Sequence, residues 1–175
     1  SAPSIRLNID TNPDYQRPSV WSISQKQLLI DTILRGYDIP KVYWRQTGAG
    51  NWGTAAPGYW SFTNGGGFNQ GAFPLAQDTA VFPASFPNTG NTITINANYN
   101  IGTIDMSLRT ANTMTLATGS SGSINVYGNW INGTGVTLTG GNTIRFAGRG
   151  SQTITSAGKT FTQILDISTP SGSVT

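Results

Sequence analysis

Five phrases of the sequence repeat one pattern, and this pattern decides the fold. They read Asn91-Thr-Ile-Thr-Ile95, Asn112-Thr-Met-Thr-Leu116, Gly135-Val-Thr-Leu-Thr139, Asn142-Thr-Ile-Arg-Phe146 and Gln152-Thr-Ile-Thr-Ser156. Each phrase begins with a polar residue or glycine, after which a polar residue, usually threonine, alternates with an apolar one. This period of two is typical of a β-strand that buries one face.

The phrases belong to a longer series of short β-prone runs separated by glycine, asparagine and serine. The runs recur about every 8 to 12 residues, a spacing that suits a sandwich, a barrel or a solenoid. They are Thr92–Ile95, Thr103–Met106, Thr113–Leu116, Ser123–Tyr127, Val136–Leu138, Thr143–Phe146, Thr153–Thr155 and Phe161–Ile167. Because the runs resemble one another, we predict a mainly β fold, a β-solenoid over residues 91–175. An antiparallel β-sandwich is the alternative.

In such a solenoid the apolar residues stack inward from coil to coil, and the threonines form ladders on the outside. Two strands with their corners give roughly 20 residues per coil. The residues expected inside are Ile93, Ile95, Met114, Leu116, Val136, Leu138, Ile144, Phe146 and Ile154. The residues expected outside are Thr94, Thr115, Thr137 and Thr153.

Residues 48–90 precede the repeats and are rich in glycine, proline and aromatic residues. The aromatic residues considered are Trp52, Tyr59, Trp60, Phe62, Phe68, Phe73, Phe82 and Phe86. The open end of a solenoid exposes apolar side chains and strand edges, so we interpret this segment as a cap. The alternative is a carbohydrate-binding platform, because aromatic faces stack on sugars. Trp52, Tyr59 and Trp60 are the candidate contacts for a glycan or a partner.

Residues 1–47 differ in composition from the rest of the chain. They hold ten of the seventeen charged residues but one of the 22 glycines. The segment contains a strand pattern, a helix pattern with a capping box, and a second β-prone run, at residues 5–9, 22–36 and 41–45. We therefore predict a short β-α-β segment, with its boundary between Arg45 and Gly50.

Several short motifs stand in one order within residues 12–40. They are Tyr15-Gln-Arg-Pro18, Trp21, the helix that follows, Arg35-Gly-Tyr37 and Ile39-Pro40. In this order they resemble the start of the ParB-like domain of a large nuclease-associated family that includes modification-dependent restriction proteins and many phage proteins. That family continues with an Asp-Gly-Gln-Gln-Arg motif that handles nucleotides, whereas this chain contains no Asp-Gly pair. The resemblance therefore implies an ancestral β-α-β piece and not the family's activity.

A second resemblance extends over residues 48–175. Its motifs are Asn51-Trp-Gly53, Pro74-Leu-Ala-Gln-Asp-Thr-Ala-Val-Phe82 and Gln152-Thr-Ile-Thr-Ser-Ala-Gly-Lys-Thr-Phe161. They resemble the β-strand repeats of autotransporter-like surface proteins and of large phage structural proteins. In such proteins a tryptophan-rich entry leads to a turn and a strand, and solenoid coils follow. The resemblance implies a surface or virion role and no reaction.

The residue types that are missing limit the chemistry of the chain. It has no Cys, no His and no Glu, and its seven acidic residues are all Asp. Catalytic sites built on His or Cys and metal sites built on thiolates are thereby excluded. Asp78, Asp105 and Asp166 are widely spaced, and we interpret them as solvated or turn-capping residues. We therefore expect no enzyme activity, no cofactor, and no catalytic, cofactor-binding or metal site.

The low charge of the chain bears on its partners. Only 10% of the residues are charged and the net charge is +3, a profile that suits a rigid extracellular or virion surface. This charge is too small to indicate nucleic acid as a partner. No run of 18 apolar residues is present, so we expect no membrane-spanning helix.

Together, these observations favour a non-enzymatic structural or interaction protein. We expect a phage virion component (a decoration, fibre or tail-associated subunit) or a cell-surface adhesin module. Its expected partners are other structural subunits, in a homo-oligomer or a larger assembly, and surface glycan. Two alternatives stay open: a DNA-binding remnant of a ParB-like nuclease domain, and a carbohydrate-binding β-helix. The last residues read like the start of another strand, so we expect the chain to be part of a longer protein.

Overall fold

The structure is a computed structural model in which residues 41–53, 58–68, 72–168 and 172–175 are described. Contacts divide the chain into two units, Ser1–Tyr37 and Asp38–Thr175. All described residues belong to the second unit. The predicted strand at residues 5–9, the predicted helix at residues 22–36 and the ParB-like stretch lie outside the described residues.

The described residues form short β-strands joined by turns, with no helix among them. The strands are β1 (Lys41–Trp44), β2 (Gly50–Asn51), β3 (Trp60–Ser61), β4 (Thr79–Val81), β5 (Asn91–Ile95), β6 (Tyr99–Ile101), β7 (Thr103–Asp105), β8 (Met114–Thr118), β9 (Ile124–Val126), β10 (Trp130–Ile131), β11 (Val136–Thr139), β12 (Thr143–Phe146), β13 (Ile154–Thr155) and β14 (Ile164–Ile167).

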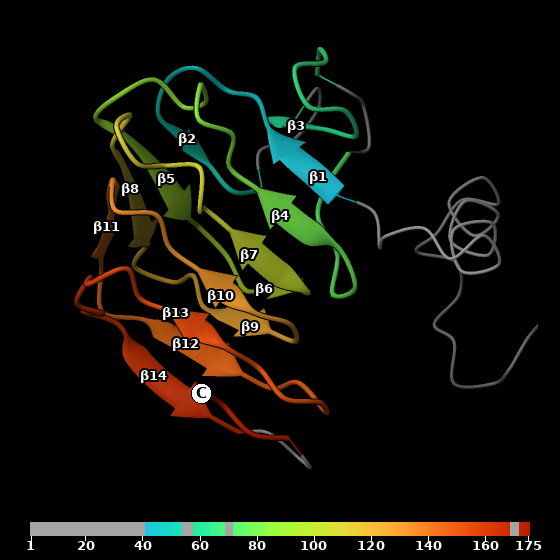
Figure 1. Cartoon of the computed structure of the whole chain (residues 1–175), viewed down its shortest axis with the longest axis vertical. Helices are drawn as coiled ribbons and strands as arrows, with labels where there is room; N and C mark the ends of the chain where they lie inside the picture. Colours follow the sequence, from blue (N-terminus) through green and yellow to red (C-terminus); the bar gives the residue numbers. More distant parts are fainter. Residues whose placement is uncertain (1–40, 54–57, 69–71, 169–171) are drawn as a thin grey trace, which may run out of the picture. The chain divides into compact units, whose positions relative to one another are not determined.

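Backbone hydrogen bonds join these strands into three sheets. Sheet A has the order β13-β10-β7-β4-β1-β3, sheet B the order β11-β8-β5-β2, and sheet C the order β14-β12-β9-β6. Each round of the chain stacks on the previous one, as Figure 1 shows from β1 in blue to β14 in red. All pairings of named strands are parallel except that of β1 with β3. The predicted β-solenoid is therefore confirmed, and the β-sandwich alternative is wrong.

The coil has one strand more than the repeat pattern predicted. From β4 to β12 each coil has three strands instead of two, one in each sheet. The register pairs Trp130 with Ile104 in the coil before and with Ile154 in the coil after, about 25 residues away in each direction. The sequence pattern missed β6 and β10 because they are only three and two residues long and lack the threonine alternation.

The apolar residues predicted to point inward form the core of the solenoid. Within sheet B, the register places Leu116 between Ile93 and Leu138, and all three side chains are buried. Eight of the nine predicted residues are buried in this way. The ninth, Ile154, is half-buried, because its strand β13 is the last named strand of sheet A. Each coil therefore buries its apolar row against the next coil.

A cluster of aromatic side chains fills the first coil. β1 pairs in parallel with β4 and antiparallel with β3, so residues 41–44 lie in sheet A of the solenoid. The ring centroids of Trp44 and Trp60 lie 5.1 Å apart, and those of Trp52 and Trp60 lie 4.9 Å apart, both in edge-to-face geometry. Phe82 stacks on Trp44. These rings supply a large buried apolar surface where sheet A ends at β3.

Neighbouring coils approach each other closely at one corner that contains two glycines. The N–H of Gly128 donates to the carbonyl oxygen of Gly102 over 2.7 Å. A Cβ atom on Gly102 would lie 2.4 Å from the carbonyl oxygen of Asp78, and one on Gly128 would lie 2.9 Å from the carbonyl oxygen of Gly102. Both distances are too short for a real Cβ atom, so this corner of the coil requires glycine.

The inward and outward positions should differ sharply in their effect on stability. We expect Leu116→Ala to lower the free energy of unfolding by about 2–4 kcal/mol, because it leaves a cavity between three coils. The matched change Thr137→Val, at an exposed outward position, should alter it by less than about 0.5 kcal/mol. Urea unfolding followed by circular dichroism measures both values. Equal losses at the two positions would contradict the assigned faces.

Candidate interaction surface

The three aspartates of the described residues lie apart from one another. Oδ2 of Asp78 accepts a hydrogen bond from the N–H of Leu75 over 2.8 Å, in the turn before β4. Oδ1 of Asp105 accepts one from a backbone N–H two residues later, over 2.9 Å. Asp105 lies opposite Val81 in the register, and Asp166 lies in sheet C. The structure therefore does not bring the three carboxylates into one groove, and two of them cap turns.

Asp78 is the buried carboxylate of this set. Burial raises the pKa of its carboxyl group, and the hydrogen bond from Leu75 acts in the opposite direction by lowering it. The backbone oxygen of Asp78 also accepts a hydrogen bond from the N–H of Thr103 over 3.0 Å, which joins the turn to β7. The carboxylate therefore caps its own turn while the backbone oxygen joins that turn to the next coil, so a structural role accounts for this residue.

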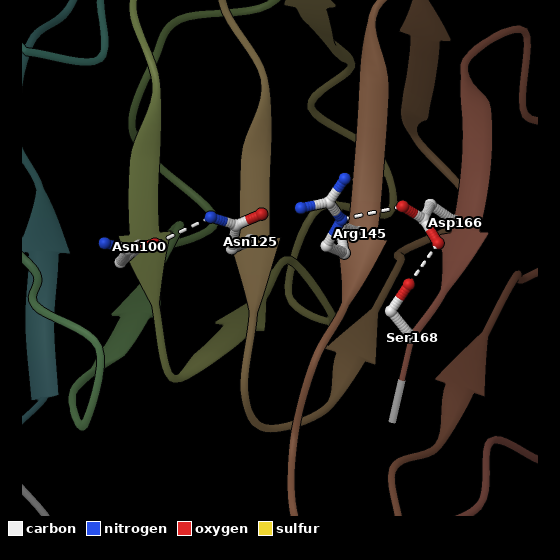
Figure 2. A network of polar contacts seen from close by, with 5 residues as sticks. All are labelled: Asn100, Asn125, Arg145, Asp166 and Ser168. Carbon is white, nitrogen blue, oxygen red and sulfur yellow. Dashed lines mark hydrogen bonds and ion pairs between the residues drawn. The ribbon is translucent and has the colours of Figure 1, made fainter. Parts of the chain in front are cut away.

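The outer face of sheet C has a row of polar side chains with one member from each strand (Figure 2). The register aligns Asn100 of β6 with Asn125 of β9, and the row continues through Arg145 of β12 to Asp166 of β14. Nδ2 of Asn125 donates to Oδ1 of Asn100 over 2.8 Å. Nε of Arg145 donates to Oδ2 of Asp166 over 2.7 Å. The row therefore consists of two hydrogen-bonded pairs that the strand register places side by side.

The charged end of this row is an ion pair with a third member. The hydroxyl of Ser168 donates to Oδ1 of Asp166. The hydrogen bond from Ser168 and then that from Arg145 lower the pKa of the Asp166 carboxyl group. Because both charged side chains are open to water, the pair adds little to stability. Its main consequence is that the negative charge of Asp166 is balanced by Arg145 within the same sheet.

An exposed aromatic ring lies on the same face of sheet C. Val126 is buried between Asn125 and Tyr127, so strand alternation places the latter two on the outside together. Tyr127 is one of the exposed large apolar side chains, together with Phe62 and Phe68. A face with amide groups, an ion pair and one tyrosine ring offers both hydrogen bonds and apolar contact to a partner.

The outer face of sheet B is a second polar surface. The register aligns Thr92 with Thr115 and Thr115 with Thr137 on three successive coils. Of the threonines expected outside, Thr137 and Thr153 are exposed, and Thr94 and Thr115 are half-buried. The apolar neighbours of Thr94, Thr115 and Thr137 on the opposite face are buried, so the predicted alternation is confirmed.

Two of the three aromatic residues proposed to contact a glycan or a partner are inside the protein. The side chains of Trp52 and Trp60 are buried, and Nε1 of Trp60 donates to the backbone oxygen of Trp52 over 3.0 Å. Tyr59 is half-buried, with its ring 5.4 Å from that of Trp44. Neither Trp52 nor Trp60 has a free face on which a sugar could stack, so only Tyr59 of the three reaches the surface.

Arg109 is a buried cation that the sequence analysis did not identify. Its Nη1 donates to the backbone oxygens of Pro83 and Ala84 over 3.0 and 2.8 Å, and its Nη2 donates to that of Thr113 over 3.2 Å. Burial lowers the pKa of the guanidinium group. The side chain ties together loops from two coils, and its only signal in the sequence is that it is the one basic residue between Arg45 and Arg145.

The described residues offer neither a metal-ligand cluster nor a membrane-spanning helix. They contain no group of three or more Asp, Glu, His or Cys side chains placed to hold a metal ion. No helix in that part of the chain has the length and apolar character needed to cross a membrane. In comparisons with protein-family models, with curated proteins and with solved structures, no match to this chain was found.

The contacts of the ion pair on sheet C predict how the carboxyl group of Asp166 titrates. A depressed carboxyl pKa stabilises the fold above the pKa of the unfolded chain, and this contribution disappears as the pH falls through the folded value. We expect Ser168→Ala and Arg145→Gln each to raise the pKa of Asp166 towards its ordinary value, measured by NMR of the carboxyl carbon. Asn100→Ala, at the far end of the row, should leave it unchanged. An unchanged Asp166 titration in both variants would contradict the contacts.

Proposed function

We propose that this protein is a non-enzymatic structural or interaction module, part of a phage virion or of a cell surface. In this proposal, the outer faces of sheets B and C contact neighbouring structural subunits. The observation that supports it is the contrast between a filled apolar interior and rows of polar side chains that follow the coils outside. Such rows repeat at the strand spacing of about 4.8 Å and so present a regular surface.

The chemistry of these faces suits contact rather than reaction. Asp78 and Asp105 are occupied in turns, and Asp166 is paired with Arg145. The remaining outward groups are mainly hydroxyls and amides, which act as hydrogen-bond donors and acceptors. With few charges on the faces, a partner is selected by shape and hydrogen bonding rather than by long-range attraction.

The other sequence-based functions have less support. The DNA-binding alternative depends on residues 1–47, most of which lie outside the described residues. The carbohydrate-binding alternative depended on exposed aromatic faces, and Trp52 and Trp60 are buried. Contact with other structural subunits is supported by the polar rows on the outer faces of sheets B and C, which belong to the described residues.

The place where the protein is found in the organism tests the proposed role. Particles and surface fractions purified from the source organism should contain the protein when analysed by quantitative mass spectrometry. Recovery in the cytosolic fraction alone would contradict the proposed role.

A pair of matched variants tests the proposed contact face. Thr137→Arg places a bulky charge on sheet B, and Thr155→Arg places the same charge on sheet A, both at exposed threonines. We expect Thr137→Arg to lower incorporation into the assembly by about tenfold, the effect of roughly 1.4 kcal/mol of lost contact energy. Thr155→Arg should be incorporated normally, and the thermal midpoints of both should match that of the original chain. Equal incorporation of the two variants would argue against sheet B as a contact face.

A further inference from the structure

The sequence contains two Asn-Gly pairs, Asn64-Gly65 and Asn132-Gly133. In both pairs a β-branched residue precedes the asparagine, Thr63 in one and Ile131 in the other. Asparagine is a thermolabile residue. It loses its side-chain amide most readily when glycine follows, because no Cβ atom then hinders the backbone nitrogen of the next residue. The two pairs therefore have matched local chemistry, and a difference in their reactivity has to come from the fold.

The first pair lies in the turn that follows β3, where both of its residues are exposed. The N–H of Gly66 donates to the backbone oxygen of Thr63 over 3.1 Å, so the hydrogen bond that closes the turn uses neither reacting group. Among the described residues, no hydrogen bond holds the side-chain amide of Asn64 or the backbone N–H of Gly65. The carboxamide of Asn64 can therefore rotate towards the nitrogen of Gly65.

The backbone of this turn also has room to rearrange. Gly65 has a φ of +79°, and a Cβ atom at this position would meet no other atom within 4 Å. Glycine moves between conformations of positive and negative φ at little steric cost. The backbone nitrogen of Gly65 can therefore approach Cγ of Asn64, as the closure of a five-membered ring requires.

The second pair is held in place by the solenoid. The side chain of Asn132 is buried; its Oδ1 accepts a hydrogen bond from Nε1 of Trp130 over 2.8 Å, and its Nδ2 donates to the backbone oxygen of Ser156 over 3.2 Å. A Cβ atom on Gly133 would lie 2.3 Å from the backbone oxygen of Arg109, so this backbone is packed against the previous coil. Neither the carboxamide nor the backbone of this pair can move into the geometry of attack.

We propose that Asn64 is a site of spontaneous deamidation, and that the fold protects Asn132 from the same reaction. This inference is independent of the proposed function. Hydroxide removes the proton from the backbone nitrogen of Gly65, and this nitrogen attacks Cγ of Asn64. The new C–N bond forms while the C–N bond of the carboxamide breaks, and the leaving amide takes a proton from water and departs as ammonia. Water then opens the cyclic imide at one of its two carbonyl groups, which leaves aspartate or isoaspartate.

The reaction consumes one water, releases one ammonia and changes the charge of the first coil. The new carboxylate lowers the net charge of +3 by one unit. It forms next to Gly65, whose backbone oxygen accepts a hydrogen bond from Nη2 of Arg45 over 3.3 Å. Nε and Nη1 of Arg45 are buried and have no hydrogen-bond partner among the described residues. A negative charge close to this guanidinium group is electrostatically favourable.

Peptide mapping by mass spectrometry tests the proposal on the whole folded chain in mildly alkaline buffer. Asn64 should deamidate with first-order kinetics at least about tenfold faster than Asn132, since the positioning of reacting atoms alone can change a rate by this much. The rate at Asn64 should rise with pH, because the deprotonated nitrogen is the nucleophile. In guanidinium chloride that unfolds the chain, the two rates should become alike. Equal rates in the folded chain, or a difference that persists after unfolding, would overturn the proposal.

Two variants at the exposed Asn64 assign the reaction to this residue. Asn64→Gln keeps the amide but would have to close a six-membered ring, which forms more slowly, so this variant should lose the conversion to a more acidic form in ion-exchange chromatography. Asn64→Asp carries the charge of the product and marks its elution position. Enzymatic methylation of isoaspartate should label the aged original chain and not the aged Asn64→Gln variant. The same conversion or labelling in Asn64→Gln would overturn the assignment.

Discussion

The structure depends on one constraint, which is that a coil can bury its apolar row only beneath another coil in the same register. The parallel pairing of Leu116 with Ile93 on one side and Leu138 on the other is the local form of this constraint. The backbone hydrogen bonds and the apolar contacts both run between coils, so a shift of one residue would turn the whole row outward. Register and burial are therefore determined together.

The same constraint explains why the first and the last of the described coils differ. The first coil has no coil before it among the named strands, and it is filled instead by tryptophan rings around Phe82. At the other end Phe161 packs on Trp130, while β14 is left with open aliphatic side chains. Large rings can cover apolar side chains at the edge of a stack without a further strand.

The sequence indicated the alternation of inward and outward residues within a strand more reliably than the number of strands in each coil. The threonine alternation located strands such as β5, β8 and β11, because their inward and outward residues differ in polarity. It could not locate β10, where only Trp130 and Ile131 are paired, so the coil was expected to have two strands. Side-chain contacts were the least predictable. Arg109 binds a loop about 25 residues away along the chain. The sequence around Trp52 does not tell whether its side chain is buried or exposed, and the structure shows that it is buried.

The glycine corner has a consequence for how such a chain can change in length. Gly128 rests on Gly102, and a side chain at either position would collide with backbone. Inserting or deleting one residue at the corner itself would move glycine away from it and bring a bulkier residue to it. Duplicating or losing an entire coil preserves the corner, because each coil contacts only the coils next to it. Evolution can thus lengthen or shorten this molecule in whole coils, whereas a change of a few residues within a coil has to fall in a turn that leaves the glycine corner in place.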